Sequence, residues 1–146
     1  MNKYLEMKKR HQKELNKLPF ICAFSDDQLK EIMKKSGLKY PDDLNQLISV
    51  TPGTFIKQDN VSEMQALFRK HKKERKEALA SDKDGTGFIY QMFYHELCNY
   101  EYGYTEEVDD TLDALGLTLD DINADKRLLK GFNKAKKDVI RNAVCW

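Results

Sequence analysis

Hydrophobic side chains recur at helical spacing along most of the chain. In the stretch 2–18, Tyr4, Met7 and Leu15 fall on one face between lysines, and Pro19 follows the last apolar position. Apolar residues three or four positions apart are typical of an amphipathic helix that buries one face, and proline ends such a helix. The pattern therefore predicts a mainly helical protein.

Similar periodicity with capping residues at the ends predicts the other helices. We expect them at 26–36, 60–81, 88–101, 105–115, 118–125 and 125–143. The N-caps expected from side-chain type and spacing are Ser25, Asn60, Thr105 and Thr118. The stretch 88–101 reads FIYQMFYHELCNYE and is apolar or aromatic on most sides. Because such a helix needs neighbours on several sides, we expect it at the centre of the core.

A smaller part of the chain has β-type character. The runs 47–50 and 54–57 flank Thr51-Pro52-Gly53, and proline with glycine favours a tight turn between two strands. The run 20–24, FICAF, fits either a strand or an extended lead-in to the next helix. The expected fold class is mainly α (α+β): a compact bundle of about six helices with a small antiparallel β-hairpin near 47–57, in a single domain over 1–146.

Composition narrows the class of protein. The chain has 146 residues, of which 40% are hydrophobic and 34% charged, enough apolar residues for one core and too many for a disordered chain. The three cysteines, Cys22, Cys98 and Cys145, form no CxxC pair, which argues against a disulfide scaffold or a zinc site. Neither a signal-peptide pattern nor a long apolar run occurs. We therefore expect a cytoplasmic protein without membrane contact.

One loop resembles a calcium site. The run DKDGTGFI at 82–89 matches the first part of an EF-hand loop, with Asp82, Asp84 and Thr86 as the oxygen ligands. The position that should carry the bidentate glutamate is Phe93. Without that carboxylate, calcium affinity should fall to roughly millimolar or weaker. The alternative is a solvated turn between two helices, where Asp and Gly are common for conformational reasons.

No sequence motif supports catalysis. His95-Glu96 begins like the zinc-protease pattern HExxH, but Asn99 stands where the second histidine is required. No phosphate-binding glycine loop and no nucleophile elbow is present. We therefore expect a protein that is not an enzyme, and calcium is the one cofactor that any pattern suggests.

Charge is unevenly distributed although the net charge is only +1. The stretch 96–125 holds ten acidic residues and no lysine or arginine, whereas 126–146 holds seven basic residues and one acid. Acidic and basic helices could neutralise each other inside the domain. Alternatively, the acids could face a basic protein partner, or basic helices could face nucleic-acid phosphates.

Specific residues follow from the last two hypotheses. The candidate partner-binding residues are Glu106, Glu107, Asp109, Asp110 and Asp113, with Tyr102 and Tyr104 at their border. Tyrosines there could be interface anchors, or they could simply wrap the central helix with their hydroxyls at the surface. The candidate nucleic-acid-binding residues are Lys72, Lys73 and Lys76.

Three phrases of the sequence carry a resemblance to a known family: FICAFS at 20–25, GFIYQMFYHELCNYEYGYT at 87–105, and TLDALGLTLDDI at 111–122. The chain resembles a family of small uncharacterised bacterial proteins, a domain of unknown function from gut Firmicutes and their phages and plasmids. The resemblance implies no activity, but it implies an accessory role in a phage or other mobile element. The chain departs from the family pattern at two places. One is Val50–Phe55, where relatives carry a glycine-rich segment, and the other is Tyr100.

The function predicted from these observations is that of a small interaction or regulatory protein acting through a charged surface on a host protein. The first alternative is a weak EF-hand-like calcium-binding module at 82–93. The second is a DNA-binding accessory protein that uses the basic helices. Nothing in the sequence decides the oligomeric state.

Overall fold

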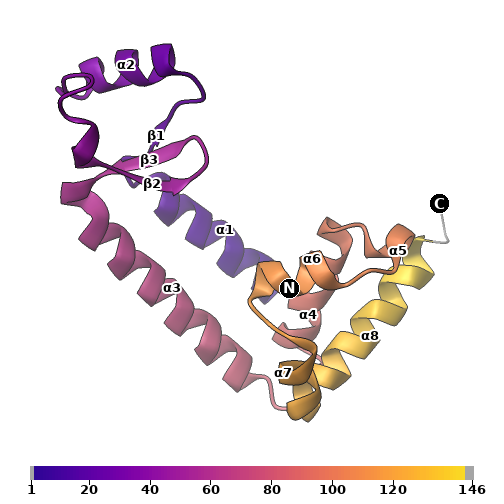
Figure 1. Cartoon of the computed structure of the whole chain (residues 1–146). Helices are drawn as coiled ribbons and strands as arrows, with labels where there is room; N and C mark the ends of the chain where they lie inside the picture. Colours follow the sequence, from indigo (N-terminus) through magenta and orange to yellow (C-terminus); the bar gives the residue numbers. More distant parts are fainter. Residues whose placement is uncertain (1, 144–146) are drawn as a thin grey trace. The chain divides into compact units, whose positions relative to one another are not determined.

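The computed structural model describes residues 2–143, which are mainly helical with a small antiparallel sheet (Figure 1). The helices are α1 Lys3–Asn16, α2 Asp26–Lys35, α3 Val61–Ser81, α4 Phe88–Asn99, α5 Tyr102–Thr105, α6 Asp109–Leu115, α7 Leu119–Ala124 and α8 Lys126–Ala143. The strands are β1 Ile21–Cys22, β2 Leu47–Thr51 and β3 Thr54–Lys57. The predicted fold class, mainly α with a small β part, is confirmed. Cys145 lies outside the described residues.

The chain packs as two compact units. The helical unit comprises the described residues up to Arg10 and those from Lys73 onward; the sheet unit comprises His11–Lys72. Both α1 and α3 contribute residues to each unit. The single domain expected over 1–146 stays a prediction.

The core of the helical unit forms where α4 packs along α8 (Figure 1). Phe93 and Phe132 meet there with their ring centroids 5.0 Å apart. Buried residues of α4 include Ile89, Phe93 and Leu97, each with no exposed surface, so the expectation that this helix is central is confirmed. It ends at Asn99 rather than at 101 because Glu101 adopts the left-handed conformation, with φ of 61°.

The sheet unit contains the predicted hairpin and one further strand. The strand order is β1-β3-β2, all antiparallel, with Ile48 opposite Ile56 and Ile21 opposite Phe55. Gly53 has φ of +79° in the turn between β2 and β3, a conformation that glycine adopts without steric penalty. The FICAF run therefore supplies a strand, which leaves Ile21 buried.

Two of the four expected N-caps are confirmed. Ser25 accepts a hydrogen bond at the start of α2, and Thr118 forms a capping box at the start of α7. The expectation for Thr105 is wrong: it lies inside α5, and the left-handed residue Glu106 follows it, so α6 begins only at Asp109. Asn60 belongs to a 3₁₀ turn that leads into α3. Residues 2–143 form eight helices where about six were expected, and α5 is the one that no expected range covers.

None of the described helices combines the length and the apolar character that a membrane crossing requires.

Candidate interaction surface and the calcium-like loop

The predicted partner-binding acids gather over α6 and the turn before it. Every one of these five side chains is exposed, and we call them the acidic surface: Glu106, Glu107, Asp109, Asp110 and Asp113. Within residues 2–143, none of them forms an ion pair with a lysine or arginine. The acidic surface therefore keeps its charge in contact with solvent.

The two ends of the acidic stretch 96–125 behave differently. Glu96 is only 3% exposed, and its Oε1 accepts a hydrogen bond from Lys8 Nζ of α1 at 2.5 Å. Asp125 pairs with Arg127 at 3.0 Å. Self-neutralisation thus occurs at the ends of the stretch but not at its middle, where α6 packs against α4.

The two candidate tyrosines are placed in opposite environments. Tyr104 is 71% exposed, whereas Tyr102 is 7% exposed and belongs to the core of the helical unit. Burial, and then the charge of Glu106, raises the pKa of the Tyr102 hydroxyl above its ordinary value. Of this pair, Tyr104 has the exposure that an interface anchor requires, whereas Tyr102 packs into the core of the helical unit.

Other tyrosine hydroxyls connect α4 to α8. The Tyr90 hydroxyl donates to Asp138 Oδ2 at 2.6 Å, and Asn142 Nδ2 donates to the Tyr94 hydroxyl at 2.6 Å. Burial and the adjacent Asp138 carboxylate raise the pKa of Tyr90 to about 12. These two residues therefore stabilise the packing of the helical unit.

A groove of about 280 Å³ lies beside the acidic surface, between α6 and α7. It is lined by Asp109, Leu112, Asp113, Leu117, Thr118, Leu119 and Asp120. Leu117 and Leu119 are not among the site residues predicted from the sequence, and Asp120 is predicted only as one of the acids of the stretch 96–125. The available signal was the pair of leucines on either side of the helix cap Thr118.

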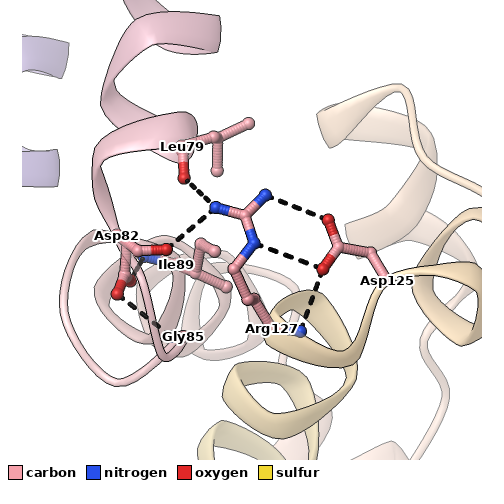
Figure 2. A network of polar contacts seen from close by, with 6 residues as sticks. All are labelled: Leu79, Asp82, Gly85, Ile89, Asp125 and Arg127. Atoms are coloured by element: carbon pink, nitrogen blue, oxygen red, sulfur yellow. Dashed lines mark hydrogen bonds and ion pairs between the residues drawn. The ribbon is translucent and has the colours of Figure 1, made fainter.

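The calcium-like loop is closed by hydrogen bonds of its own (Figure 2). Asp82 is 9% exposed; its Oδ1 accepts from the Gly85 N–H at 3.0 Å, and its Oδ2 from the N–H groups of Gly87 and Ile89 at 3.1 and 2.9 Å. The last two donors lie at the start of α4, which has no other side-chain cap. Asp82 thus satisfies N–H groups that the helix itself leaves without partners.

Arg127 holds the same loop from the other side (Figure 2). Its Nη1 donates to the carbonyl oxygens of Leu79 and Asp82, both at 2.9 Å, while Nη2 donates to Asp125 Oδ2 at 3.0 Å. The guanidinium holds the pKa of the Asp125 carboxyl below its ordinary value. One side chain therefore connects the last turn of α3 to the start of α8.

The other two candidate calcium ligands bond to each other. Asp84 Oδ1 accepts from the N–H and the hydroxyl of Thr86, at 2.9 and 2.6 Å, and these bonds lower the pKa of Asp84. The part of the chain that the structure describes has no group of three His, Cys, Asp or Glu residues able to hold a metal ion. Calcium binding at Asp82, Asp84 and Thr86 stays a prediction.

The candidate nucleic-acid-binding lysines lie on α3. Lys72, Lys73 and Lys76 are exposed, as a phosphate contact would require. Exposed lysines are also the ordinary outer face of a soluble helix. Binding of nucleic acid by these residues stays a prediction.

Comparison with known proteins identifies a family. A protein-family model fits residues 3–138, and its description is "family of unknown function (DUF7659)". No curated protein and no solved structure matches the chain.

Proposed function

Because the chain belongs to DUF7659, a family of unknown function, no activity comes with its membership, and we propose a function from its surface. The protein is a non-enzymatic interaction protein whose acidic surface binds a basic region of another protein. The single observation that carries this proposal is the absence of ion pairs on the acidic surface throughout residues 2–143.

The acidic surface carries an energetic cost that a basic partner would relieve. Like charges crowded on one short segment repel each other and disfavour the folded state. A partner with lysines and arginines would relieve that repulsion, and the charge would speed its approach. The segment is also well supported: Leu112 is buried, and the Thr111 hydroxyl donates to the Glu96 carbonyl oxygen at 3.3 Å. A rigid surface loses little conformational entropy on binding.

The biological setting belongs to the same proposal. The resemblance to proteins of bacterial phages and plasmids supports an accessory role in the cytoplasm of a bacterial cell, with a host protein as the partner. An acidic surface can compete with phosphate backbones for a basic site. This supports inhibition of a host complex that handles nucleic acid.

A pull-down from a lysate of the source organism tests the proposal. The variant Asp109→Lys/Asp110→Lys reverses two charges in the first turn of α6. Asp26→Lys/Asp27→Lys is the matched control because it makes the same change in the first turn of α2, also at exposed positions. We expect the α6 variant to weaken partner recovery roughly tenfold and the α2 variant to leave it unchanged. The proposal is contradicted if the two variants recover the partner equally well, or if the unchanged protein recovers no partner.

The two alternatives have their own tests. A calcium-dependent rise in Tm would favour the module at 82–93. DNA binding that falls steeply with salt, and that is lost when Lys72, Lys73 and Lys76 are changed to alanine, would favour the accessory DNA-binding protein.

A further inference from the structure

The groove between α6 and α7 is shaped first by the way α6 ends. Gly116 has φ of +68°, and its N–H donates to the Asp113 carbonyl oxygen at 3.2 Å while the Leu117 N–H donates to the Leu112 carbonyl oxygen at 3.0 Å. These two bonds form a Schellman motif, in which the residue after the glycine packs back against the last helical turn. Leu117 and Leu112 therefore form one apolar wall.

The opposite wall of the groove is the start of α7, which a capping box holds in place. Thr118 Oγ1 accepts from the Asp121 N–H at 3.1 Å, and the Thr118 N–H donates to Asp121 Oδ2 at 3.0 Å. Leu119 is the first residue of α7 and remains 51% exposed. Because local hydrogen bonds hold both walls, the groove is preorganised and needs little ordering on binding.

The chemistry of the lining indicates what the groove accepts. Its apolar part is Leu112, Leu117 and Leu119, and its rim carries Asp109, Asp113 and Asp120. None of these three aspartates forms an ion pair in the described part of the chain. A volume of about 280 Å³ is at or below the small end of ligand sites, which span roughly 300–1,000 Å³. It suits a side chain that protrudes from a larger partner.

We infer that this groove receives an apolar side chain from a basic amphipathic helix of the partner, with lysines or arginines of that helix facing Asp109, Asp113 and Asp120. The inference rests on the proposed function and names its partner class. An amphipathic helix fits because it places an apolar anchor and basic residues one turn away on a single face. Charge complementarity brings the helix to the surface, and the apolar anchor sets its position.

Two synthetic helical peptides of equal charge test the inference by fluorescence anisotropy. In the first peptide, leucines three or four positions apart form one face of the helix and lysines flank them. In the second peptide, every leucine is replaced by alanine. We expect the leucine peptide to bind roughly tenfold more tightly, since only it has an anchor that buries apolar surface. Leu119→Ser should remove most of that difference. Leu44→Ser is the matched control because Leu44 also opens a short helical segment and is 37% exposed; it should change nothing.

A second variant keeps the test independent of folding. Asp113→Asn removes one rim charge in the C-terminal half of α6, where a negative charge opposes the helix dipole, so the variant should remain folded. This variant should weaken the binding of both peptides by a similar factor.

The outcomes separate the inference from the function on which it rests. Equal binding of the two peptides, or no effect of Leu119→Ser, overturns the groove inference. If binding is still lost in Asp109→Lys/Asp110→Lys, the acidic surface remains a binding site. Failure of both peptides to bind also overturns the inference. If the pull-down still recovers a partner that the α6 variant loses and the α2 variant keeps, the proposed function stands.

Discussion

Asp82 shows how one side chain can resemble an ion ligand while performing a structural task. It accepts hydrogen bonds from three backbone N–H groups, two of them at the start of α4. Asp84 also matches a ligand position of the EF-hand pattern, but it is exposed and accepts hydrogen bonds from the N–H and hydroxyl of Thr86. The two aspartates therefore differ in structural importance, and this difference can be measured.

Asp82→Ala should lower the free energy of unfolding by about 2 kcal/mol, because the buried N–H groups of the loop lose their acceptor. Asp84→Ala should have a clearly smaller effect. Chemical denaturation with calcium and with a chelator measures both variants. We expect the Asp82→Ala loss to be the same in both conditions; a loss that appears only with calcium would favour the EF-hand hypothesis.

At the scale of elements, the packing of α8 on α4 and on the loop before it depends on the missing side chain of Gly131. A Cβ built at this position would lie 2.5 Å from the Gly85 carbonyl oxygen and 2.7 Å from Ile89 Cγ2. Real side chains do not approach backbone atoms so closely. The helix and the loop would have to separate to admit even a methyl group.

Gly131→Ala should therefore destabilise the protein by about 2 kcal/mol through overpacking. In an exposed helix the same change would stabilise by about 1 kcal/mol, because alanine is the better helix former. Asn133→Ala, at an exposed position of the same helix, is the control and should change stability by less than about 0.5 kcal/mol. Thermal unfolding followed by circular dichroism gives both values, and a stabilised Gly131→Ala would contradict the close approach.

At the scale of the whole molecule, the described residues 2–143 form one apolar cluster in each unit. Leu97 belongs to the cluster of the helical unit and Ile56 to that of the sheet unit, and both are fully buried. Because α1 and α3 are continuous helices with residues in both units, unfolding of one unit should disrupt helices that the other needs. We expect one cooperative transition.

Leu97→Ala and Ile56→Ala test this expectation by calorimetry. Each should destabilise by about 2–5 kcal/mol, the usual cost of a cavity left by a large buried aliphatic side chain. If the protein unfolds as one domain, each variant lowers the Tm of a single transition. Two transitions, each sensitive to only one of the variants, would show that the units unfold separately.

The sequence by itself determined most of the elements. The helices α4 and α8, the hairpin and the Thr118 cap were predictable because their signals are local: apolar spacing within a turn, and capping bonds three residues long. The prediction from the sequence was wrong at 101–108, where Glu101 and Glu106 adopt left-handed conformations with φ of 61° and 57°. Such conformations are rare for residues other than glycine, so a glutamate at these positions does not predict them.

Only the tertiary structure decided which charged and aromatic residues remain exposed and which are buried or paired. Glu96 is neutralised by Lys8, 88 positions away in the sequence, while Asp109 and Asp113 have no ion-pair partner in residues 2–143. Tyr102 is buried, yet Tyr104, two positions later, is exposed. These outcomes depend on which elements pack together over long sequence separations. Local spacing specifies a helix, but the identity of its neighbours specifies which of its side chains remain available for binding.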